Sequence, residues 1–75
     1  MDFKNINLLH DLALVYAKLE NRGMAALITA ERFGLTGALK DAQRHAKKAK
    51  ALLPQGSPPW QRAQDILNAN HLKSN

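Results

Sequence analysis

The most regular alternation of apolar and polar positions in the chain lies between Thr36 and Leu53. At about 100° per residue, its small apolar residues fall on one side of a helix and most of its basic residues on the other. The apolar side is made of Ala38, Leu39, Ala42, Ala46, Ala49 and Leu53. The pattern predicts an amphipathic helix over about 37–53, capped by the Thr36 hydroxyl and ended by Pro54, which has no backbone N–H.

An earlier stretch predicts a first helix over about 4–21, with bulkier apolar residues. One stripe at helical spacing is formed by Leu8, Leu9, Leu12, Val15, Tyr16 and Leu19. Alanines leave the central helix with little side-chain bulk, so we expect this stripe to pack against its alanine face. Gly23 suits the left-handed position that ends such a helix. A second apolar side indicates burial on two sides or a contact with another chain, and it comprises Ile6, Ala13, Leu14 and Ala17.

Residues 24–33 are apolar nearly all round, which favours a short buried helix that Gly34 ends. A last helix over about 58–70 is predicted by Ser57, whose hydroxyl can cap it, and by Pro58, which tolerates the first helical position. We expect Trp60 to anchor this helix to the others.

Residues 1–75 therefore predict one all-α domain, a small bundle of three to four helices. The composition is 45% hydrophobic, which is too apolar for a disordered chain, but a core in 75 residues is marginal. Short chains with a marginal core are commonly stabilised by self-association, and a homodimer through Leu14 and its neighbours is the simplest expectation.

The composition also restricts the cellular location and the kinds of metal or disulfide site that we expect. The chain has no cysteine, so disulfides and thiolate metal sites are excluded. No run approaches the roughly 20 apolar residues of a membrane span, and the first residues lack the pattern of a signal peptide. We expect a cytoplasmic protein with no membrane partner.

Charge is unevenly distributed along the chain. The net charge is +5, and all of it lies in residues 38–75, because acidic and basic side chains are equal in number in residues 1–37. Such asymmetry predicts an anionic partner, either nucleic acid or an acidic protein surface. The alternative is that the basic face of the predicted central helix serves only solubility.

Part of the sequence resembles the pattern of a helix-turn-helix, with Ala30, Gly34 and Leu35 at its small, turn and apolar positions. Later positions fit less well, because Lys40 and Gln43 fall where the motif needs apolar residues. If the central helix binds DNA, Lys47, Lys48 and Lys50 are candidates for phosphate contacts. Lys40, Gln43 and Arg44, near its start, are candidates for base edges.

Catalysis and metal binding have weaker support in the sequence. His10, His45 and His71 lie on three different predicted helices, and no two of them have the spacing of a helical zinc site. Neither a nucleophile with its base nor a phosphate-binding glycine loop is readable. We expect no enzyme activity, no cofactor and no small-molecule substrate.

The leading hypothesis is thus a small regulatory protein that uses the basic helix face on an anionic partner, with DNA favoured. The alternative is an adaptor or inhibitor that binds another protein. In that case the residues expected to contact the other protein are Ile6, Ala13, Leu14, Ala17 and Trp60.

Overall fold

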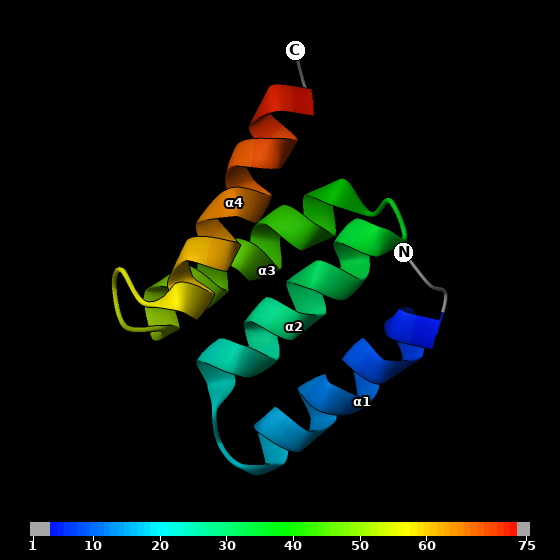
Figure 1. The fold of residues 1–75 in the computed structure, drawn as a ribbon, viewed down its shortest axis with the longest axis vertical. Coiled ribbons are helices and arrows are strands. Elements are labelled where there is room, and N and C mark those ends of the chain that lie inside the picture. Colours follow the sequence, from blue (N-terminus) through cyan, green and yellow to red (C-terminus); the bar gives the residue numbers. More distant parts are fainter. Residues whose placement is uncertain (1–3, 74–75) are drawn as a thin grey trace.

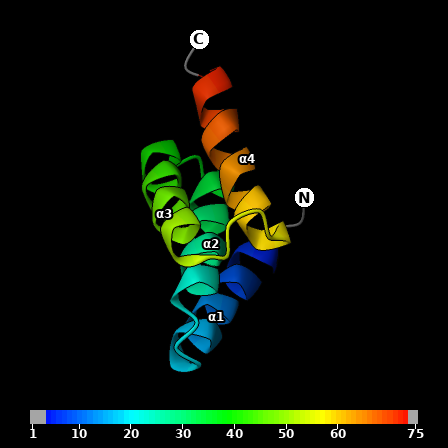
Figure 2. The same ribbon diagram turned by 90° about the vertical axis from the view of Figure 1, so that its left-hand side faces the viewer.

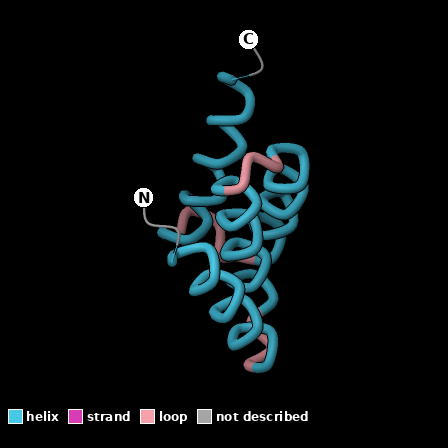
Figure 3. Tube along the Cα trace, turned by 90° about the vertical axis from the view of Figure 1, so that its right-hand side faces the viewer, coloured by secondary structure: helices cyan, strands magenta, loops and turns pink. Residues whose placement is uncertain are grey.

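The computed structural model describes residues 4–73, and the side chains of residues 7–68, as helices joined by short loops (Figure 3). The helices are α1 (Lys4–Lys18), α2 (Arg22–Leu35), α3 (Leu39–Leu52) and α4 (Pro58–Lys73). This confirms the all-α bundle, and the described residues include no strand.

Helix α2 lies at the centre of the molecule. Helices α1 and α3 lie on its two sides, and α2 and α3 run side by side in opposite directions (Figure 1). Helix α4 packs on α3 and, less extensively, on α2 (Figure 2). Within the described part of the chain, α1 contacts no helix except α2. The Cα atoms extend over 38 × 30 × 17 Å, so the molecule is flat.

The core lies between α2, α3 and α4. It is built from two leucines, Leu27 and Leu53, and from alanines that let the helices approach closely. Its members are Ala26, Leu27, Ala30, Ala46, Ala49, Leu53 and Ala63. The alanine face of α3 is therefore buried as predicted, but its neighbours are α2 and α4.

The predicted packing of the leucine stripe of α1 against α3 is wrong. Among the described residues, helix α1 contacts α2 alone, and the half-buried side chains on it are Leu9, Ala13 and Tyr16. The rest of the stripe faces outward, with exposed fractions of 57% at Leu8, 43% at Leu12, 50% at Val15 and 69% at Leu19. The spacing of the leucines identified an apolar side of α1. It did not predict how the helix is rotated about its axis, and this rotation determines which of the apolar residues contact α2.

The turn between α1 and α2 corrects the role predicted for Gly23. Helix α1 ends with Glu20 in the left-handed conformation, at φ 60°. The Glu20 N–H donates to the carbonyl of Ala17 at 3.1 Å and the Asn21 N–H to that of Tyr16 at 2.8 Å, which is a Schellman motif. Asn21 then caps α2 by accepting from the Met24 N–H at 3.2 Å. Gly23 is buried inside α2.

The turn between α2 and α3 also differs from expectation. Ala38, not Thr36, is the N-cap of α3, and it makes no side-chain cap. The Thr36 hydroxyl instead donates backward to the Phe33 carbonyl at 3.0 Å. Gly34 does not end α2, which continues to Leu35, and the left-handed residue of this turn is Gly37, at φ 84°.

The start of α4 agrees with the sequence. The Ser57 hydroxyl accepts from the Trp60 N–H at 3.4 Å, as a serine cap does. Trp60 is half-buried and packs against the edge of the core, which confirms it as an anchor of α4.

Candidate functional site

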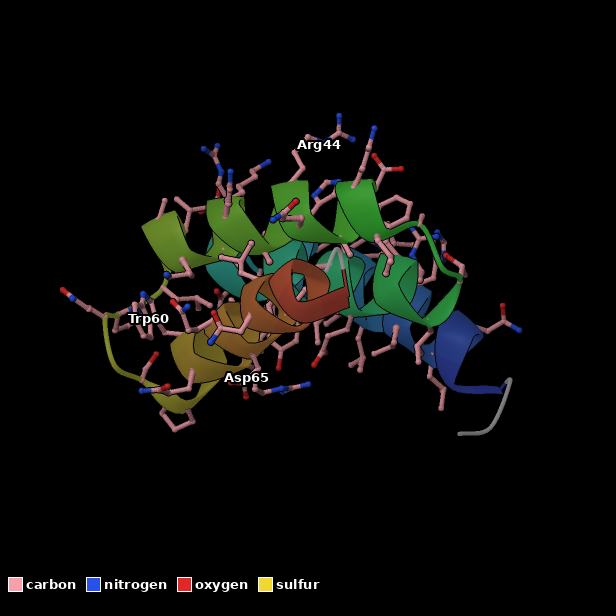
Figure 4. All side chains as sticks on the ribbon, turned by 90° about the horizontal axis from the view of Figure 1, so that it is seen from above. Arg44, Trp60 and Asp65 are labelled. Carbon is pink, nitrogen blue, oxygen red and sulfur yellow. The ribbon has the colours of Figure 1, made fainter. Side chains whose placement is uncertain are left out.

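The outer face of α3 carries exposed cationic side chains. Lys40, Arg44 and Lys47 are three or four residues apart and lie opposite the buried alanines. Arg44 extends from the helix away from the rest of the molecule, whereas Asp65 lies on the far side of α4 (Figure 4). The helix thus holds a row of positive charge that points out of one broad face of the flat fold.

Most of this positive charge is not neutralised within the chain. Arg44 Nη2 donates to Asp41 Oδ1 at 2.8 Å, an exposed pair of the kind that contributes about 0–1 kcal/mol. Among the described residues, Lys40, Lys47 and Lys48 form no hydrogen bond or ion pair. These three lysine side chains are exposed to solvent.

Two members of the predicted nucleic-acid set lie elsewhere. Lys50 is half-buried on the flank of α3 that faces α4, where its ammonium group donates to Gln64 and lies 4.7 Å from the centre of the Trp60 ring. This cation–π contact links α3 to α4. Gln43 is half-buried on the same flank, two turns earlier. The structure therefore gathers Lys40, Arg44, Lys47 and, at the border, Lys48.

The opposite flank of α3 borders an open groove that we call the α1–α3 groove. It has a volume of about 680 Å³. It is lined by His10, Ala13, Leu14, Ala17, Arg22, Ala25, Ala26, Thr29, Arg32, His45, Lys48, Ala51 and Leu52. Three predicted interface residues, Ala13, Leu14 and Ala17, meet here. Trp60 does not join them, and the side chain of Ile6 lies outside the described residues.

His45 lies where the groove meets α3. Its ring stacks on Phe33, with 5.3 Å between centroids and 20° between planes. Burial lowers the pKa of His45 below its usual value, and the charges of Arg44 and Lys48 lower it further. The ring is therefore predominantly neutral at pH 7.

A second groove, about 530 Å³, lies on the other side of α1 and is lined by α1, α2 and α4. Leu8, Leu9, Leu12 and Ile66 give it an apolar lining, and Arg62 and Glu31 form an ion pair there. Sequence reasoning missed both grooves, because a groove is a gap between helices and its walls depend on their packing order.

Metal sites and membrane spans were the remaining features that the sequence argued against. Within the described residues, no three His, Cys, Asp or Glu side chains are grouped as a metal site requires, and the side chain of His71 lies outside them. The same residues include no helix with the length and apolar character needed to span a bilayer. Comparison of the chain with protein-family models, with curated proteins and with solved structures found no match.

Proposed function

We propose that the protein is a regulatory binding protein that engages DNA through the outer face of α3. The supporting observation is the row of Lys40, Arg44 and Lys47, with Lys48 beside it, and the absence of a carboxylate partner for the three lysines within the described residues. Regularly spaced, unpaired cations are suited to a phosphate backbone, whose charges attract them at any sequence.

The proposed contacts are to phosphates rather than to base edges. In a helix-turn-helix the second helix crosses the first steeply, at about 90–120°, and enters the major groove. Helices α2 and α3 instead run side by side (Figure 1), and Gln43, a base-edge candidate, is half-buried. Binding of this kind has little sequence preference and depends strongly on salt.

The test is a fluorescence-anisotropy titration of a labelled duplex of about 24 base pairs at several salt concentrations. Three to four phosphate contacts predict that log K falls with log salt with a slope of about −3. Lys40→Glu/Lys47→Glu should weaken binding more than about tenfold and reduce the slope by about 2 units. Lys40→Arg/Lys47→Arg, which keeps the charge, is the matched control. The proposal is wrong if the glutamate variant binds like the wild type.

We further propose that the protein acts as a homodimer, joined through the outward side of α1 that carries Leu8, Leu12, Val15 and Leu19. These four side chains are 43–69% exposed, and two of them, Leu8 and Leu12, line the second groove, which extends the apolar surface. This assignment differs from the Leu14 side favoured by the sequence, because the α1–α3 groove is bordered by cations that two copies would bring together.

A further inference from the structure

The α1–α3 groove has the dimensions and lining of a seat for one helix. Its floor is the alanine-rich surface of α2, and its walls carry Leu14 from α1 and Leu52 from α3, which are 51% and 47% exposed. Helices α1 and α3 do not touch within the described part of the chain, so the groove is open along its length. Helix α2 has 14 residues, about 21 Å, which matches a guest helix of about four turns.

The residues that line the groove are basic or neutral, and none is acidic. Arg22 and Arg32 are ten residues apart on α2, about 15 Å, so one cation lies towards each end. Lys48 and the two histidines, His10 and His45, complete the rim. Asp41 and Asp11 lie outside the lining, the first paired with Arg44 and the second 3.6 Å from His10.

One of these cations retains an unused donor. The Arg32 guanidinium is held 5.0 Å from the centre of the Phe33 ring. Its Nε is buried and makes no hydrogen bond within the described part of the chain. A carboxylate is the acceptor that guanidinium groups bind best, and Arg32 is one of the residues that line the groove.

From this charge complementarity we propose that the α1–α3 groove binds an acidic amphipathic helix of a partner protein. Leucine-type side chains at i, i+3 or i+4, and i+7 of the guest pack between Leu14 and Leu52. Glutamates or aspartates on its flanks meet Arg22, Arg32 and Lys48. The site borders the outer face of α3 proposed for DNA and shares only Lys48 with it. DNA has no side chains to occupy the apolar walls.

The test uses a fluorescein-labelled helical peptide of about 18 residues, with leucines along one face and glutamates on both flanks. We expect saturable binding, and amide shifts at Leu14, Ala17 and Leu52 in a two-dimensional NMR titration. A peptide with lysines in place of the glutamates should bind at least about tenfold more weakly. No binding at millimolar peptide, or equal binding of the lysine peptide, overturns the proposal.

Variants of the protein separate this groove from the other surfaces. Leu14→Ser and Arg22→Glu should each weaken peptide binding about tenfold. Both positions are exposed, and an acidic residue at the start of α2 suits the helix dipole, so both variants should fold. Leu12→Ser, on the other side of α1, is the matched control and should bind normally. If Leu12→Ser weakens binding as much as Leu14→Ser, the groove is not the site.

The DNA variant completes the comparison. Lys40→Glu/Lys47→Glu should lose DNA and retain the peptide, because neither lysine lines the groove. If the peptide is lost with DNA and Leu14→Ser has no effect, the peptide binds to the outer face of α3 and the inference fails. If the peptide is retained and DNA binding is absent in the wild type, only the DNA proposal fails.

Discussion

At the scale of single residues, Gly23 is packed closely against the end of α3. A Cβ placed there lies 2.8 Å from Leu53 Cδ2, 2.9 Å from Leu53 Cγ and 3.3 Å from the backbone carbon of Leu52. The start of α2 thus crosses the end of α3 without room for a methyl group. Gly34, on the same helix, has no neighbouring atom within 4 Å of the point where a Cβ would stand, and its φ is not unusual.

These two glycines make a matched pair of substitutions. Gly23→Ala should lower the free energy of unfolding by about 1–3 kcal/mol, because Leu53 must leave its rotamer or the helices must separate. Gly34→Ala should raise it by up to about 1 kcal/mol, because alanine favours the helix and meets no neighbour. Urea unfolding followed by circular dichroism measures both. Equal effects of the two substitutions would contradict the close contact at Gly23.

His45 makes stability depend on pH. Its pKa is lowered in the folded state by burial and by Arg44 and Lys48, so the unfolded chain takes up the proton first as pH falls below about 6.5. The contribution of His45 to stability is full above that pH and is lost as pH falls towards the folded pKa. His45→Phe keeps an aromatic ring beside Phe33 and should flatten the loss of stability between about pH 7 and 5. Urea midpoints across this range measure it, and parallel curves for the two proteins would refute the assignment.

The role of a single residue was predictable from the sequence where it depends on residues nearby in the chain. The Ser57 cap depends only on its neighbours along the chain and was found as predicted. Gly23 was assigned to a helix end because glycine suits that position, but the Schellman motif uses Glu20 and glycine is needed for a contact with Leu53. That contact is thirty residues away, so no local pattern reveals it.

At the scale of elements, the helices differ in how much supports them. Helices α2, α3 and α4 share a core, whereas α1 packs on α2 alone within the described residues. The four predicted helices and their order are confirmed, with ends that differ by up to three residues. It was harder to predict which helix packs against which apolar face. Both α1 and α4 have an apolar side, and the sequence pattern does not show which of them packs against α3.

The weak attachment of α1 should appear in hydrogen exchange. Amides of α1, such as those of Leu12 and Val15, should exchange through a local opening that costs less than global unfolding. Amides in the middle of α2, such as that of Leu27, should require an opening close to global. Native-state exchange at low denaturant concentrations measures both sets. Equal opening free energies for Val15 and Leu27 would show that α1 is an integral part of the core.

At the scale of the whole molecule, the charged and apolar surfaces point in different directions. The basic face of α3 points out of one broad face of the flat molecule, and α1, at one edge, exposes two apolar sides (Figures 1 and 4). The uneven charge was readable from the sequence and remains in the described part of the fold, apart from Arg44 and Arg62, which pair with carboxylates, and Lys50, which contacts α4. The grooves were not readable, because they arise from the gaps that the arrangement leaves on the two sides of α1.

The proposed dimer is a property of this scale. Leu8→Glu/Leu12→Glu places charges in the apolar side of α1 and should convert the protein to a monomer. Sedimentation equilibrium at tens of micromolar protein measures the mass. Leu14→Glu is the control and should leave the dimer intact, since Leu14 lies on the other side of α1. A monomeric wild type, or a monomer produced only by Leu14→Glu, would contradict the proposed interface.

Trp60 is the only tryptophan in the chain, and its indole is covered by the Lys50 ammonium at 4.7 Å. The intrinsic fluorescence of Trp60 consequently reports on one helix–helix contact, that between α3 and α4. Emission at this position should stay constant while α1 loosens or a guest enters the groove, and should change when α4 detaches. The protein thus carries, without any label, a signal that distinguishes partial opening from complete unfolding.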